Sequence, residues 1–128
     1  MQDWQKSWAQ NKYWIMSRSQ HFYNEVRLLA KENQWNDESQ RRYQFILDEV
    51  ERMSPTKATL TTAYQHVWGY FKKVVNANEI KKYQILLNEL DKGNDKLGIY
   101  LVELTDKYGV QYLLDSVLIR KLRKEAKS

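Results

Sequence analysis

The stretch DESQRRYQFILDEVERMSP, residues 37–55, carries the clearest mark of secondary structure in this sequence. A helix turns once in about 3.6 residues, so apolar side chains spaced three and four apart fall on one face. The start suits a helix, because Asp37 and Glu38 favour a first turn, and Pro55 ends it. The residues of the apolar face are Tyr43, Ile46, Leu47, Val50 and Met53.

The same spacing recurs on both sides of this stretch, and no segment alternates as a half-buried strand would. Gly93 is placed to follow the fifth predicted helix and Gly109 the sixth. The sequence therefore predicts an all-α chain, a single compact domain of six to seven short helices. From first to last apolar residue, the predicted helices are 4–15, 22–30, 43–53, 60–75, 80–90, 97–104 and 110–118.

Composition limits the classes of protein to consider. A chain of 128 residues, 42% hydrophobic, is enough for one core and too short for two. It has no Cys, its first residues lack the apolar centre of a signal peptide, and no apolar run is long enough for a membrane span. We therefore expect a cytoplasmic protein without a membrane partner, made of a helical domain at 1–119 and a basic tail at 120–128.

The net charge of +5 is concentrated in two segments. Residues 54–83 hold five Lys and one Glu, and residues 120–128 hold five basic residues and one Glu, so each segment carries +4. An uneven positive field attracts polyanions such as nucleic acid, although Lys-rich surfaces also serve solubility alone. In the second segment the basic residues surround the expected helix, which favours a solvated or phosphate-facing end. They are Arg120, Lys121, Arg123 and Lys124.

Residues that support catalysis are scarce. His21 and His66 are the two histidines, they fall in different predicted helices, and no spacing of His, Glu or Cys is typical of a metal site. The four glycines are scattered, so no Gly-rich loop is available to hold a phosphate. The sequence predicts neither a metal nor a cofactor, and it favours a binding protein over an enzyme while leaving the enzyme open.

The stretch YQHVWGYFKK, residues 64–73, gathers the most polar and aromatic side chains. On a continuous helix, His66, Tyr70 and Lys73 share one face at spacings of four and three. Such a face suits nucleic acid, because tyrosine stacks on bases and lysine neutralises phosphates. The alternative is a buried His–Tyr hydrogen bond beside Gly69, where a second helix approaches closely. The candidate binding residues are Gln65, His66, Tyr70, Lys72 and Lys73.

A second group of basic and aromatic residues lies earlier in the chain. Lys12 and Arg18 stand among Tyr13, Trp14 and Tyr23. Aromatic residues at helical spacing usually belong to a core, so this group has two interpretations, a binding surface or part of the interior.

Three motifs resemble the YbgA family, a bacterial family of unknown function. They are NKYWIMSRS at 11–19 followed by Tyr23, PTK at 55–57, and HVWGYFKK at 66–73. The resemblance spans most of the chain. It implies that the matching basic and aromatic residues act together, namely Lys12, Arg18, Lys57, His66, Tyr70, Lys72 and Lys73.

The resemblance also implies a class of partner. YbgA domains occur alone and as the C-terminal part of proteins whose N-terminal domain resembles a thiouracil desulfidase. Those fusions act on thiolated tRNA, the iron–sulfur chemistry belongs to the other domain, and the YbgA-like part is thought to engage the RNA. Without Cys ligands, desulfidation does not transfer to this chain.

Three hypotheses follow. The first is a module that binds tRNA or another structured RNA through a basic and aromatic helical face, with Arg120 and Arg123 adding phosphate contacts. The second is a protein–protein adaptor for an RNA-modification or DNA-repair enzyme, such as a desulfidase-like partner. The third is an enzyme in which His66 acts as general base beside Tyr70 and Lys73.

Overall fold

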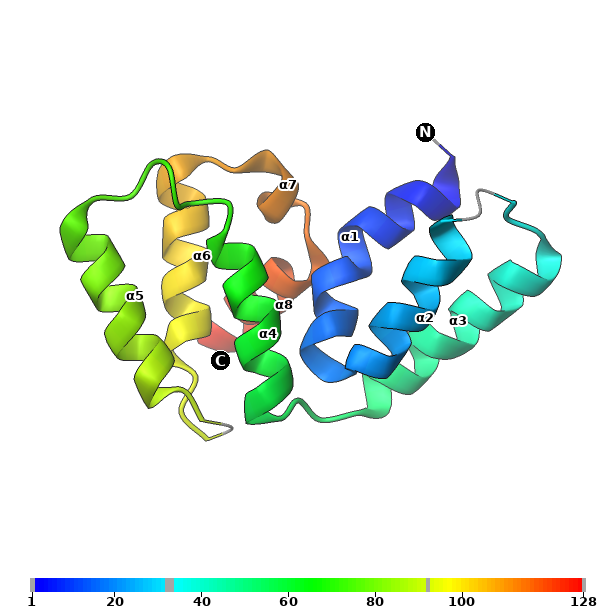
Figure 1. Cartoon of the computed structure of the whole chain (residues 1–128), viewed down its shortest axis with the longest axis horizontal. Helices are drawn as coiled ribbons and strands as arrows, with labels where there is room; N and C mark the ends of the chain where they lie inside the picture. Colours follow the sequence, from blue (N-terminus) through cyan, green and yellow to red (C-terminus); the bar gives the residue numbers. More distant parts are fainter. Residues whose placement is uncertain (1, 32–33, 92, 128) are drawn as a thin grey trace.

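The structure, a computed structural model, describes residues 2–31, 34–91 and 93–127 and is all-α (Figure 1). These residues form one compact domain of eight helices without a β-strand; a single bridge pairs Asp91 with Asn94. The helices are α1 (Asp3–Arg18), α2 (Gln20–Lys31), α3 (Asp37–Arg52), α4 (Lys57–Trp68), α5 (Ala77–Glu89), α6 (Lys96–Tyr108), α7 (Gln111–Leu114) and α8 (Val117–Ala126).

Local sequence explains where several helices begin and end. The Asn36 side chain accepts a hydrogen bond from the Ser39 N–H at 2.8 Å and caps α3, whose predicted extent is confirmed. Asn76 and Glu79 cap the start of α5 together. The Asn76 side chain accepts a hydrogen bond from the Glu79 N–H, and the Glu79 side chain accepts one from the Asn76 N–H. At the end of α6, Gly109 takes a φ of 61°, the left-handed conformation that glycine adopts at little cost.

The predicted helix over 60–75 is too long, because α4 ends at Trp68. Gly69 is a weak helix former, and after it two backbone hydrogen bonds span three residues instead of the four of an α-helix. The Tyr70 N–H donates to Val67 O, and the Phe71 N–H donates to Trp68 O. These tight turns carry Phe71 into the core, where it is fully buried. Tyr70 and the two following lysines therefore lie in turns and do not continue the helical face of His66.

The predicted helix over 110–118 is interrupted in the structure. It becomes the four-residue α7 and the longer α8, with a bend at Asp115 and Ser116. The predicted limit between 119 and 120 falls inside α8, where Leu122 is buried against the core. Gly93 does not end α5, which stops at Glu89.

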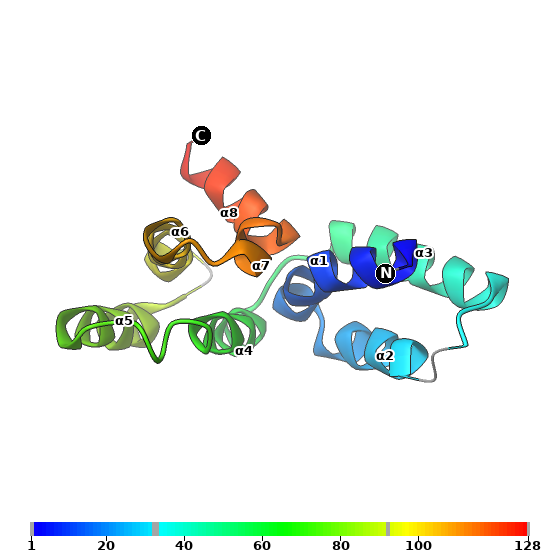
Figure 2. The same cartoon turned by 90° about the horizontal axis from the view of Figure 1, so that it is seen from above.

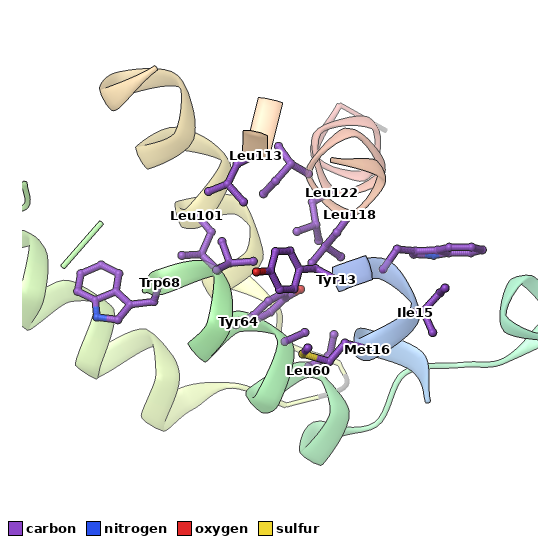
Figure 3. Packing of buried hydrophobic residues seen from close by; sticks show 14 of the residues in the cluster. Tyr13, Ile15, Met16, Leu60, Tyr64, Trp68, Leu101, Leu113, Leu118 and Leu122 are labelled. Atoms are coloured by element: carbon purple, nitrogen blue, oxygen red, sulfur yellow. The ribbon is translucent and has the colours of Figure 1, made fainter. Parts of the chain in front are cut away.

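Helix α1 holds the molecule together. It packs against α2 and α3 on one side and against α4 and α8 on the other, and α6 completes the second group by packing on α4, α5 and α8. Figure 2 shows this arrangement from above, with α1 between the two groups. Side chains from α1, α4, α6 and α8 meet around the fully buried Tyr64 (Figure 3). No helix in the described ranges has the length and hydropathy to cross a membrane.

Candidate nucleic-acid interface

The end of α4 opens onto a shallow hollow of about 340 Å³. Its lining consists of Gln65, His66, Gly69 and Lys72, all of them exposed. Gly69 contributes no side chain to this lining. Here the structure brings together three candidate residues that the sequence predicted.

Three tyrosines from separate segments meet beside this hollow. The Tyr70 and Tyr112 rings stack with centroids 5.6 Å apart and planes 12° apart, and the Tyr13 ring stands edge-on to Tyr70 at 6.1 Å. The Tyr13 and Tyr70 hydroxyls lie 3.0 Å apart, and the Tyr112 hydroxyl donates to the Ala9 carbonyl at 2.9 Å. Tyr70 remains 39% exposed and Tyr112 37%, while Tyr13 is buried. Tyr70 and Tyr112 therefore present aromatic surface to solvent, and the buried Tyr13 packs against them from inside the protein.

Tyr112 was missed by sequence reasoning. It lies in α7, a single helical turn too short for any periodic pattern, and its contact with Ala9 spans 103 residues of chain. No local signal identifies such a residue. The nearby Tyr13 was recognised as aromatic, although its role in supporting Tyr70 was not.

His66 is exposed, so the alternative of a buried His–Tyr hydrogen bond is wrong. Its ring centroid lies 6.3 Å from that of Tyr13, and its imidazole has no hydrogen-bond partner among the residues that the structure describes. Burial raises the pKa of Tyr13 well above its usual range, and the hydrogen bond with Tyr70 raises it further. The pKa of Tyr112 is raised as well, mainly by burial, so these phenols stay neutral at physiological pH.

The lysines of this region are free to meet a partner. Lys72 and Lys73 are exposed, and neither pairs with a carboxylate in the part of the chain that is described. Lys57 is exposed too, but it opens α4 whereas His66 stands near its end, about 14 Å away along the axis. Lys57 therefore lies outside the hollow.

Arg18 belongs to the scaffold. Its guanidinium donates to the Met53 carbonyl at 2.6 Å and, more weakly, to the Val50 carbonyl at 3.4 Å, both at the end of α3. It also lies 5.8 Å from the centre of the Trp14 ring. A cation at this point offsets the partial negative charge of the helix end, so Arg18 ties α1 to α3.

The remaining predicted cations are also engaged within the protein. Arg123 forms a two-pronged ion pair with Asp106 at 2.6 and 2.8 Å, and Arg120 donates to the Asp115 carbonyl at 2.5 Å. Lys12 stands 6.0 Å over the Trp8 ring. None of these three lines the hollow at the end of α4.

The described residues contain no group of three or more His, Cys, Asp or Glu placed to hold a metal ion. The hollow offers hydrogen-bonding groups from Gln65 and His66 and positive charge from Lys72, and the tyrosines beside it offer stacking surface. This combination can hold a flat ring attached to an anion.

A family model described as "Protein of unknown function (DUF1722)" matches residues 12–121, a range that includes every candidate site residue except Arg123. No curated protein and no solved structure matches the chain.

Proposed function

The chain belongs to this family of unknown function, and from the geometry at the end of α4 we propose that it binds structured RNA, such as tRNA. The observation that carries the proposal is the stacked pair of Tyr70 and Tyr112, exposed beside two unpaired lysines. An aromatic pair fixed by hydrogen bonds offers a base a rigid platform. Stacking on such a ring contributes about 1–3 kcal/mol per base.

The feature of RNA that fits is an unpaired base in a loop or at an end. Aromatic side chains stack on bases that have left a helix, whereas the edges of paired bases in the deep groove of duplex RNA are out of reach. Gln65 and His66 supply donors and acceptors for a base edge or a phosphate. Lys72 and Lys73 neutralise the adjoining backbone, which makes the interaction dependent on salt.

The choice of tRNA rests on the motif resemblance. We propose that this member of the family is YbgA-like, because the segments 11–19, 55–57 and 66–73 match that family's pattern. The desulfidase fusions in which YbgA domains occur act on thiolated tRNA. A cytoplasmic protein that presents a tRNA to a separate modifying enzyme would use the same surface.

The test is a fluorescence-anisotropy titration with bulk tRNA and with duplex DNA, at low and moderate salt. The variant Lys72→Ala/Lys73→Ala should bind tRNA more weakly than the unaltered protein. The slope of log binding constant against log salt concentration should become shallower by about one for each lysine removed. The control is Arg41→Ala/Lys96→Ala, which removes the same charge from exposed positions on α3 and α6 and should bind normally.

Three results would overturn the proposal. tRNA binding that is absent, or that does not respond to salt, removes RNA as the partner. Equal affinities for both double variants place the site elsewhere, and preference for duplex DNA over tRNA contradicts the role assigned to an unpaired base.

A further inference from the structure

A second basic and aromatic surface lies between α1 and α2. It is a wide groove of about 700 Å³, and nothing in the sequence singled it out. The volume falls within the range of small-molecule sites, though the groove is open along its length. It is lined by Trp4, Gln5, Trp8, Arg27, Ala30 and Lys31.

The two tryptophans of the groove are held in fixed positions. Trp4 stacks on Trp35 with centroids 4.4 Å apart and planes 2° apart, and Trp8 packs against Tyr23 at 5.7 Å. Trp4 also donates its indole N–H to the Gln2 side chain at 2.9 Å. Because these rings are already ordered, stacking a ligand on them costs little conformational entropy.

The charge of the groove has one sign. Arg27 and Lys31 are exposed, and among the described residues they have no ion-pair partner and no acidic side chain lines the groove. Flat rings together with unpaired cations complement a ligand that carries both a ring and a negative charge. A nucleotide has this chemistry.

Tyr23, a buried residue of α2, lies between the groove and the tyrosine cluster. Tyr23 touches Trp8 in the groove and lies close enough to Tyr13 and Tyr112 to raise the pKa of both. Lys12, placed over Trp8, adds positive charge along this path. Tyr13 and Trp4 are nine residues apart on α1, about 14 Å along its axis and on opposite faces of the helix, so a strand that meets both sites passes around α1.

We infer that the groove between α1 and α2 binds further nucleotides of the same single-stranded RNA segment that stacks on Tyr70 and Tyr112. The inference rests on the proposed function and extends it, because it turns a single stacking site into a track. Bases stack in the groove near Trp4 and Trp8, and Arg27 and Lys31 neutralise phosphates there.

The experiment compares oligouridylates of about 4 and about 16 nucleotides, which span the site sizes of single-strand-binding domains. The unaltered protein should prefer the longer oligomer clearly. Arg27→Ala/Lys31→Ala should bind the longer oligomer at least about fivefold more weakly, so that the preference for length becomes smaller. The slope of log binding constant against log salt concentration should become shallower by about two. Arg41→Ala/Lys96→Ala loses the same charge and should keep the preference.

The outcomes separate the two proposals. If neither oligomer nor tRNA binds the unaltered protein, the proposed function fails. If RNA binds and Lys72→Ala/Lys73→Ala weakens it while Arg27→Ala/Lys31→Ala keeps the full length preference, the groove is not part of the site and only this inference is overturned. Equal binding of oligodeoxythymidylate of the same length would contradict RNA as the occupant.

Discussion

The Tyr13 hydroxyl lies 3.0 Å from the Tyr70 hydroxyl, which joins α1 to the turns after α4 across 57 residues of chain. This contact fixes the orientation of Tyr70, whose ring is edge-on to Tyr13 and stacked with Tyr112. A residue outside regular secondary structure is thereby held in place by contacts of its side chain.

Tyr13→Phe should lower the free energy of unfolding by about 1 kcal/mol, the usual net contribution of one hydrogen bond. The ring remains and keeps the packing of this buried position, while the Tyr70 hydroxyl turns to water. Urea unfolding measures the change. Tyr70→Phe removes the same bond, so the double variant should lose less than the sum of the two single losses; strict additivity would show that the bond contributes nothing.

Arg18→Ala should destabilise the protein by about 1.5–3 kcal/mol, because hydrogen bonds from a charged group to the carbonyls at the end of α3 are lost. Arg18→Lys should recover only part of this, since an ammonium lacks the fork of the guanidinium. The affinity for tRNA, measured where the variants are folded, should stay within about twofold of normal. An Arg18→Ala protein with normal stability and lost RNA binding would make Arg18 a contact residue.

Gly98→Ala should be among the most damaging small substitutions. A Cβ there would lie 2.7 Å from the Tyr64 hydroxyl and 2.9 Å from both Asp95 Oδ2 and Leu122 Cδ2. Overpacking of this kind costs about 1–3 kcal/mol, and here it also disturbs the Tyr64–Asp95 hydrogen bond. Gly93→Ala is the control, because nothing lies within 4 Å of its Cβ position. Thermal unfolding should show a lower Tm only for Gly98→Ala.

Glu79 should make stability depend on pH in the acid range. The hydrogen bond from Tyr108, the capping N–H of Asn76 and the ion pair with Lys107 lower its pKa from 4.5 to about 2. A carboxyl whose pKa is lower in the folded state contributes stability that is fully present above the unfolded value. That contribution is lost as the pH falls from about 4.5 towards 2.

Glu79→Gln should remove this part of the pH dependence. The amide keeps the shape of the side chain and does not titrate, so the variant should be less stable than the unaltered protein at pH 7 and closer to it at low pH. Urea unfolding at a series of pH values measures the difference. A constant gap between the two proteins across this range would mean that Glu79 is not the titrating group.

Helix positions could be predicted where capping residues and periodicity agree. The start of α3 at Asp37 and the end of α6 before Gly109 were predicted and are confirmed, because such signals depend only on a few neighbouring residues. The caps Asn36 and Asn76 were not recognised in the sequence. The end of α4 could not be predicted from the apolar pattern. Phe71 continues the apolar spacing of a helix, but it lies in tight turns after α4. These turns bury its side chain in the core as a continued helix would, so the apolar pattern does not distinguish the two.

The candidate site divides along a similar line. Gln65, His66 and Lys72 were predicted together and lie together, since neighbours in sequence stay neighbours after one turn. Arg18 matched a motif, but its partners are backbone carbonyls more than thirty residues away, and no sequence pattern encodes such a bond. Tyr112 was missed for the same reason, because its contacts are made only in the folded chain.

The central position of α1 has a consequence for synthesis on the ribosome. The Lys121 Nζ of α8 lies 4.7 Å from the centre of the Trp14 ring in α1, and apolar residues of α8 lie beside that ring. The ribosome synthesises α8 roughly a hundred residues after Trp14. A nascent chain that has released α1 must therefore leave the part of this indole that faces α8 exposed until α8 emerges. Chaperones that shield apolar segments have an opportunity to bind here, and this domain cannot complete its core before α8 has emerged.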